Sequence, residues 1–158
     1  MVALSTSRFK NGRFTFPDGF QSAPKTLVDF IDFKGEKDED YYLPSQNRYH
    51  DMILKQAKDR QRIYQLRKYT VRVKESGVCP TLTANMGQGG HNVPFVFDKK
   101  GLRKLTENEC LGLQGFPEKF KFPDSVPRYA RYVQIGNSVS PKVAARLATA
   151  VRKKLEKG

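Results

Sequence analysis

The chain has 158 residues, a formal net charge of +13 and a pI near 9.9. This length suits one ordinary domain with a modest core, which excludes an enzyme with separate cofactor and substrate domains. No stretch approaches the roughly 20 apolar residues that span a bilayer, and no signal-peptide pattern opens the chain, so we expect a soluble, cytoplasmic protein without membrane contact.

The first part of the chain predicts short elements. Residues 2–4 are a candidate strand. Residues 26–33 and 49–58 carry apolar side chains at helical spacing, and each predicts a short helix. The acidic tract between them, residues 36–40, is expected to be a surface loop.

The middle of the chain changes character. Between residues 63 and 97 the apolar residues are β-branched or aromatic and come in short runs, which predicts short, twisted strands. Residues 48–74 are strongly basic, and an excess of Lys and Arg attracts nucleic acid, although a solvated charged face is the alternative. Residues 85–92 contain three glycines and predict a flexible loop.

Two helices are predicted near the C-terminus. Thr106 and Glu109 suit a T-x-x-E capping box for a helix over residues 106–113. Ser140 as N-cap and Pro141 as first helical residue begin a longer helix with one apolar face. The residues of this face are Val143, Ala144, Leu147, Ala150, Val151 and Leu155.

The chain offers few metal ligands. Cys79 and Cys110 have no CxxC partner, and His50 and His91 are the only histidines. Because four closely spaced zinc ligands are missing, no metal site is expected. Both thiols are expected to be reduced, buried and structural.

Two motifs in the last third of the chain occur in a fixed order. The first, over residues 103–117, reads Arg103-Lys104-Leu105-Thr106-x-x-Glu109-Cys110-x-x-Leu113-Gln114-Gly115-Phe116-Pro117, and the second, over residues 134–139, reads Gln134-x-Gly136-Asn137-Ser138-Val139. Together they closely resemble the ninth and tenth conserved motifs of the DNA (cytosine-C5)-methyltransferases. The resemblance implies a restriction-modification type of transferase that acts on double-stranded DNA with S-adenosyl-L-methionine.

The resemblance assigns the second motif to the return of the chain from the small domain to the catalytic domain. Asn137 is implied to bind S-adenosylmethionine, with Ser138 and Val139 as weaker candidates. We expect this motif at the entry to the last helix, where free backbone N–H groups can hold a polar ligand. A helix cap without a ligand is the structural alternative.

The first motif has a structural role by the same resemblance. Arg103, Glu109 and Gln114 are implied to organise the target-recognition region rather than to touch reacting atoms. The rigid donor fork of Arg103 can bridge buried carbonyls or a carboxylate.

Two upstream segments resemble the DNA-recognition loops of the family. They are Arg62-Ile63-Tyr64, and Thr81-Leu82-Thr83-Ala84 with the glycine-rich segment that follows it. Thr81 is implied to contact the backbone at the extruded nucleotide. Arg62 is a candidate for guanine readout, with a phosphate contact or a solvated side chain as alternatives. The candidate DNA-binding residues are Arg62, Tyr64, Thr81, Asn85, Gly87, Gln88, Gly89 and Gly90.

The catalytic motifs of the family are missing from this sequence. It has no Phe-x-Gly-x-Gly, no Pro-Cys-Gln and no Glu-Asn-Val, whereas C5 methylation needs a cysteine nucleophile, a glutamate and a cofactor loop. Neither Cys79 nor Cys110 is expected to be the nucleophile. We therefore expect no catalytic residue here, and no activity until a catalytic subunit or N-terminal half is supplied as partner.

The sequence predicts an α+β fold: a small, irregular, mainly antiparallel β domain for target recognition, with short helices and a C-terminal helix that packs on a catalytic domain. The expected boundary separates residues 1–134 from residues 135–158. The leading hypothesis is the DNA-recognition half of a cytosine-C5 DNA methyltransferase, associated with a bacterial-type nucleoid.

Two other functions remain open: a stand-alone, sequence-selective DNA-binding module without catalysis, and a basic RNA-binding domain. The apolar face of the last helix argues against the stand-alone module, because without a partner that face would stay in water.

Overall fold

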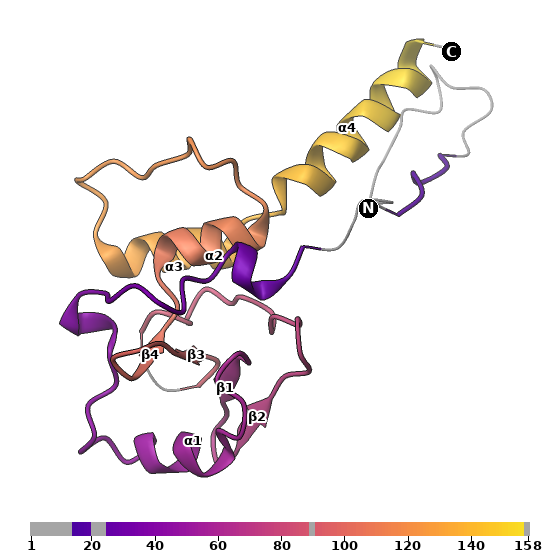
Figure 1. The fold of residues 1–158 in the computed structure, drawn as a ribbon. Helices are drawn as coiled ribbons and strands as arrows, with labels where there is room; N and C mark the ends of the chain where they lie inside the picture. Colours follow the sequence, from indigo (N-terminus) through magenta and orange to yellow (C-terminus); the bar gives the residue numbers. More distant parts are fainter. Residues whose placement is uncertain (1–13, 20–24, 89–90, 157–158) are drawn as a thin grey trace. The chain divides into compact units, whose positions relative to one another are not determined.

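The computed structural model describes residues 14–19, 25–88 and 91–156 (Figure 1). The chain divides into two compact units, Pro24–Ser138 and a second unit of Met1–Ala23 with Val139–Gly158. This division falls after Ser138, and the expected domain boundary after residue 134 stays a prediction. The strand expected at residues 2–4 lies outside the described residues.

The unit Pro24–Ser138 is built on a four-stranded antiparallel sheet. Its strands are β1 (Tyr64–Leu66), β2 (Val71–Val73), β3 (Pro94–Phe97) and β4 (Leu102–Lys104), in the order β2-β1-β3-β4. All four residues of β3 are buried, as expected for a short apolar run bounded by turns. The predicted α+β fold with a small antiparallel sheet is therefore confirmed.

The described chain also contains two 3₁₀ turns, η1 and η2, and four α-helices. Helices α1 and α2 lie where the sequence predicts them, and α2 begins with the expected capping box between Thr106 and Glu109. Helix α3 was not expected. The bounds are η1 (Leu27–Asp29), η2 (Glu39–Tyr41), α1 (His50–Gln56), α2 (Glu107–Gln114), α3 (Arg128–Asn137) and α4 (Pro141–Glu156).

The helix predicted over residues 26–33 is wrong, because only η1 forms there. The Asp32 carboxylate accepts hydrogen bonds from the backbone N–H groups of Lys34, at 3.0 Å, and Gly35, at 2.8 Å. Such local side-chain bonds offer the backbone an alternative to the helix. The segment therefore turns instead of continuing as a helix.

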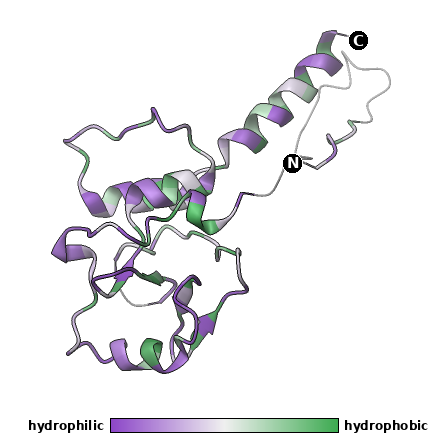
Figure 2. Cartoon of the chain, viewed as in Figure 1, coloured by the Kyte–Doolittle hydropathy of each residue, from purple (hydrophilic) through white to green (hydrophobic). Residues whose placement is uncertain are grey.

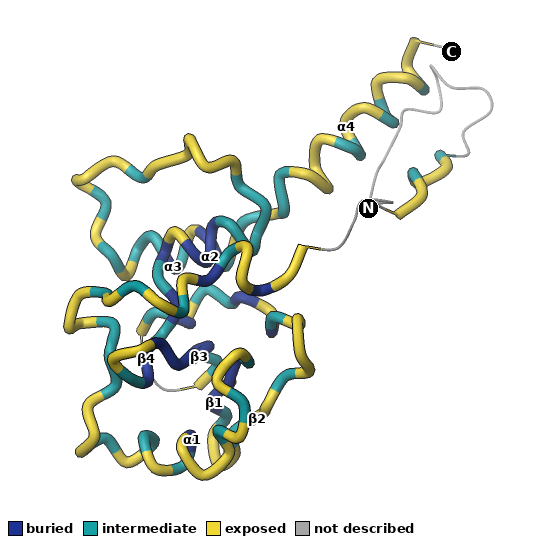
Figure 3. The backbone as a smooth tube through the Cα atoms, in the orientation of Figure 1, coloured by how far each residue is buried: buried dark blue, intermediate teal, exposed yellow. Residues whose placement is uncertain are grey.

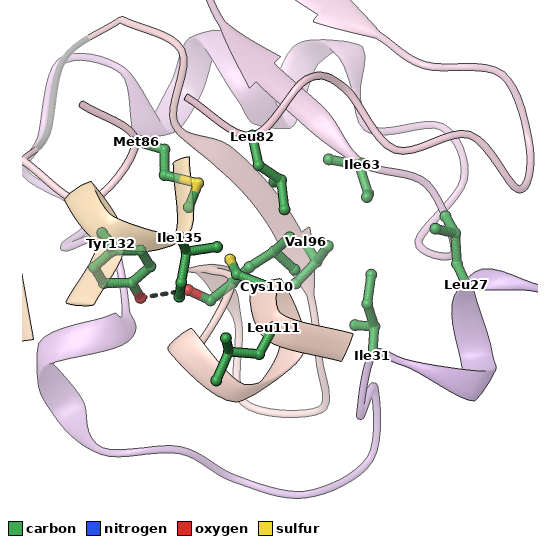
Figure 4. Close-up of a cluster of buried hydrophobic side chains, with 11 residues drawn as sticks. Leu27, Ile31, Ile63, Leu82, Met86, Val96, Cys110, Leu111, Tyr132 and Ile135 are labelled. Carbon is green, nitrogen blue, oxygen red and sulfur yellow. Dashed lines mark hydrogen bonds between the residues drawn. The ribbon is translucent and has the colours of Figure 1, made fainter. Parts of the chain in front are cut away.

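The two faces of the sheet carry separate hydrophobic cores. Side chains alternate along a strand, so Val96 packs with residues of α2 and α3, whereas Phe95 and Phe97 pack with Ile53 of α1. Helices thus cover both faces of the sheet (Figure 1), and dark blue buried residues mark β1, β3 and β4 in Figure 3, whereas β2 has no buried residue. The core beneath α2 and α3, drawn in Figure 4, consists of Leu27, Ile31, Ile63, Leu82, Met86, Val96, Leu105, Cys110, Leu111, Tyr132 and Ile135.

The other unit contains α4, which begins at Pro141 as predicted. The Ala144 backbone N–H donates to the Ser140 carbonyl over 3.0 Å. Hydrophobic and hydrophilic residues alternate along α4 in Figure 2, yet none of its residues is buried within the described chain (Figure 3). Phe16, Val143 and Leu147 line a mainly apolar pocket of about 300 Å³ in this unit. Among the residues described, no helix is both long enough and apolar enough to cross a membrane.

Candidate functional site

Arg103 of β4 is the largest fully buried side chain among the described residues. Its Nε donates to Asp98 Oδ2 over 2.8 Å, and its two terminal nitrogens bind both Glu109 carboxylate oxygens at 2.8 Å each. The same nitrogens donate to the carbonyls of Asp32, at 2.7 Å, and Lys104, at 3.2 Å. All five N–H donors of the guanidinium are thereby used.

The charges of this network stabilise one another. Burial alone would raise the pKa of Asp98, but hydrogen bonds from Gly101, Tyr42 and Arg103 outweigh it and lower the pKa. Burial alone would lower the pKa of Arg103, but hydrogen bonds to Glu109 and Asp98 raise it. The ion pairs therefore persist at neutral pH and join β4 to the start of α2.

The first motif also holds the C-terminal half of α3. Gln114 Nε2, at the end of α2, donates to the Ser138 carbonyl over 3.0 Å. The Ser138 hydroxyl donates to the Ile135 carbonyl over 2.7 Å, and the Tyr132 hydroxyl donates to the Leu105 carbonyl over 2.5 Å (Figure 4). The two conserved motifs thus form one hydrogen-bonded assembly.

Helix α3 also packs closely against the segment that follows Thr81. A Cβ at Gly136 would lie 2.2 Å from the Ala84 nitrogen and 2.3 Å from the Thr83 carbonyl carbon. A Cβ at Gly87 would lie 2.3 Å from the Tyr132 ring. Only glycine permits such close approaches. The second motif is therefore in direct contact with the backbone of a segment predicted to bind DNA.

This segment forms what we term the 83–88 turn. The Met86 N–H donates to the Thr83 carbonyl over 3.0 Å, and the Gln88 N–H donates to the Asn85 carbonyl over 3.2 Å. Met86 is buried, whereas Asn85 and Gln88 are exposed. Residues 85–88 lie outside helices and strands, as the loop prediction expects, and a buried side chain and two turn hydrogen bonds order them. Gly89 and Gly90 lie outside the described residues.

The sequence analysis placed the second motif at the entry to the last helix. In the structure, its residues up to Asn137 form the end of α3 instead. Asn137 is the last residue of α3, where carbonyls rather than N–H groups lack helical partners. Its side chain is exposed, Ser138 is half-buried and its hydroxyl is bound within α3, and Val139 is 67% exposed. Asn137 is therefore exposed at the C-terminal end of α3.

The other candidate DNA-binding residues differ in accessibility. Thr81 is exposed, and Arg62 is half-buried with its Nε 2.9 Å from Asp59 Oδ2. Tyr64 is 0% exposed, and its hydroxyl donates to the Asp59 carbonyl. The prediction of DNA contact by Tyr64 is therefore wrong in this structure, because its ring belongs to the core beside α1 and has no free surface.

Neither cysteine has the environment of a nucleophile. Burial raises the pKa of the Cys79 thiol to about 12 and raises the pKa of Cys110 well above its ordinary value. Because the thiolate is the reactive form, alkylation of Cys79 by iodoacetamide at pH 8 is expected to be roughly a thousandfold slower than that of a free cysteine. Mass spectrometry of timed samples measures this rate, with the denatured chain as control. Equal labelling of the folded and denatured chains would contradict it.

A sequence profile of the C-5 cytosine-specific DNA methylases matches residues 7–153. The chain belongs to this family. It is 41% identical over 148 residues to the Type II methyltransferase M.Bsp6I of Bacillus sp. (strain RFL6), a match that covers 93% of this chain and 46% of the relative. A tRNA (cytosine(38)-C(5))-methyltransferase of Mus musculus is 44% identical over 48 residues, which are 30% of this chain and 12% of that protein.

A solved structure of the Entamoeba histolytica methyltransferase EhMeth is also similar, with a TM-score of 0.49 and 27% identity over 90% of this chain and 45% of that one. The chain thus spans under half the length of these relatives. Members of the cytosine-C5 methyltransferase family use S-adenosylmethionine as the methyl donor.

Proposed function

We propose that this chain is the DNA-recognition part of a cytosine-C5 DNA methyltransferase and that it completes the S-adenosylmethionine pocket of a separate catalytic part. The contact between Gly136 and the backbone of Thr83 and Ala84 carries the proposal. It brings the motif of the implied cofactor ligand, Asn137, against the segment implied to bind DNA. Both would then face one reaction centre.

Double-stranded DNA is the proposed substrate. The net charge of +13 favours a polyanion. The Type II methyltransferase relative matches 93% of this chain, whereas the tRNA methyltransferase matches 30% of it. Because the longer match includes the recognition segments, it favours DNA over RNA.

Asn137 fits a contact to the cofactor better than its neighbour does. No described residue hydrogen-bonds to the Asn137 amide, and the side chain is exposed at the end of α3. The Ser138 hydroxyl and carbonyl already bind Ile135 and Gln114. We therefore propose that Asn137 donates or accepts a hydrogen bond with S-adenosylmethionine, which supplies the methyl group, and that Ser138 holds the end of α3.

Reconstitution tests the proposed function. The chain is co-expressed with candidate catalytic chains that carry Pro-Cys-Gln and Glu-Asn-Val, and methyl transfer from labelled S-adenosylmethionine to duplex DNA is measured. We expect transfer with the complex and none with either component alone. The Asn137→Ala variant is expected to raise the KM for the cofactor about tenfold, as for one lost hydrogen bond to a charged ligand.

Two controls separate this proposal from its alternatives. Thr149→Ala, on the exposed side of α4, should leave the cofactor KM unchanged. Transfer to RNA but not to DNA would contradict the choice of substrate. Inactivity with every intact catalytic partner, together with DNA binding by the chain alone, would favour the stand-alone binding module.

A further inference from the structure

Three contacts hold the 83–88 turn in place, while the side chains of Asn85 and Gln88 stay exposed to solvent. Met86 is 1% exposed and packs in the core that contains Tyr132 and Ile135 (Figure 4). Gly87 lies against the Tyr132 ring. On the N-terminal side of Met86, the backbone of Thr83 and Ala84 lies against Gly136. Asn85 stands between these two contact points and is exposed.

The turn also orients the amide of Asn85. The Thr83 hydroxyl lies 2.7 Å from Asn85 Oδ1. An amide oxygen can only accept, so the hydroxyl donates to it. The Nδ2 group keeps its two N–H donors, and none of the described residues accepts from it. Asn85 therefore presents donors outward while its oxygen is engaged.

We propose that Asn85 is a specificity-determining residue that donates to a base edge in the major groove, and that Tyr132 and Gly136 are its positioning residues. This inference rests on the proposed function. A donor matches guanine O6 and N7 or thymine O4, and it also matches adenine N7, but the adenine N6 amino group beside that atom needs an acceptor, as the amino group of cytosine does. An asparagine that reads adenine uses both its oxygen and its nitrogen, and here the oxygen is bound to Thr83. The preferred base at the contacted position is therefore guanine or thymine.

Selection from a duplex library tests the base contact. The full chain, alone and in the reconstituted complex, is incubated with duplexes that have a randomised centre, and the bound fraction is sequenced. Asn85→Ala is expected to lose about tenfold of the discrimination at one position and to leave other positions unchanged. Asn85→Asp replaces the donors by an acceptor of the same shape and is expected to shift that position towards cytosine or adenine.

A double-mutant cycle tests the positioning role. Gly136→Ala forces the Thr83–Ala84 backbone to move and is expected to lose the same preference as Asn85→Ala. Because both changes act through one contact, the double variant should lose no more than either single variant. Gly101→Ala is the matched control, since no atom lies within 4 Å of its Cβ position, and it should keep the wild-type preference. Thermal unfolding of each variant identifies any that fails to fold.

A milder variant covers the case in which Gly136→Ala unfolds. Thr83→Val keeps the shape of the side chain but removes the hydroxyl that holds the Asn85 oxygen. With its oxygen released, the Asn85 amide can pair with both N6 and N7 of adenine. The selected sequences are therefore expected to include adenine at the same position, with little change in thermal stability.

Two outcomes separate the inference from the proposed function. A uniform loss of affinity in Asn85→Ala, with every base preference kept, would show a phosphate contact and overturn the inference alone. The absence of duplex binding and sequence selection by both the chain and the complex would overturn the proposed function with it.

Discussion

Replacement of Arg103 by methionine is expected to lower the free energy of unfolding by about 3–5 kcal/mol at pH 7, as for a buried ion pair that loses one partner. The change leaves the carboxylates of Asp98 and Glu109 without the guanidinium that they share. It also leaves the Asp32 carbonyl without its donor. Denaturant unfolding followed by circular dichroism measures the loss.

This loss should depend on pH in a defined direction. In the wild-type chain the pKa of Asp98 is lowered, so its contribution is present above its unfolded pKa, near 3.9, and is lost as the pH falls through the folded value. In the variant, one of the donors that lower the pKa of Asp98 is missing, so its folded pKa lies closer to the unfolded value and less of this contribution remains at neutral pH. The difference between the two proteins should therefore be largest near neutrality and should shrink towards pH 4.

Arg62→Met is the matched control for this prediction. The Arg62–Asp59 pair is 38% and 44% exposed, and such pairs contribute about 1 kcal/mol or less. Unfolding of Arg103→Met at the same denaturant concentration as this control would contradict the structural role of the buried network.

Replacement of Val143 by aspartate is expected to weaken association with the catalytic part by about a hundredfold or more. Val143 is 41% exposed on the apolar face of α4, and no described residue of that helix is buried. If this face packs on the catalytic part, as the sequence analysis predicts, the variant would bury an unpaired carboxylate there. Analytical ultracentrifugation of the mixed components measures association.

Thr149→Asp carries the same new charge on the opposite side of α4, where the Thr149 hydroxyl is exposed. It should associate like the wild-type chain. Equal binding by both variants would place the interface elsewhere. The circular dichroism of both should match that of the wild type, because the unit Pro24–Ser138 holds the buried core.

Strong local signals made much of the fold predictable. The capping residues of α2 and the Ser140-Pro141 start of α4 are decided by neighbouring residues, so they can be read from a short window. The family resemblance predicts a structural role for the first motif, and Arg103 of this motif lies in a buried network with Asp98 and Glu109. The sequence could not predict every acceptor that binds the Arg103 guanidinium, because one of them, the Asp32 carbonyl, lies 71 residues away in the sequence.

Helix α3 shows why part of the site was missed. Pro127 and the Gly136-Asn137 pair are typical of loops. The structure instead has a helix that begins directly after Pro127 and includes Gly136 and Asn137, stabilised by the packing of Tyr132 and Ile135. Tyr132 and Met86 were not predicted as site residues, since buried aromatic and thioether side chains indicate a core in any sequence. The glycines Gly87 and Gly136 are the signal that could have identified them. Each glycine allows a neighbouring group to approach closely: the Tyr132 ring at Gly87, and the backbone of Thr83 and Ala84 at Gly136.

The atoms of residues 83 and 84 that lie nearest to Gly136 are backbone atoms. Backbone atoms are the same whatever side chains they carry, so this contact places no demand on the identity of the residues that we propose to face DNA. If these residues read DNA as we propose, substitutions at Asn85 or Gln88 would change the preferred sequence while the contact beneath them stays intact. Relatives with different target sequences could then exchange this short segment, and chimaeric enzymes built at its two ends should keep their fold while adopting the donor's specificity.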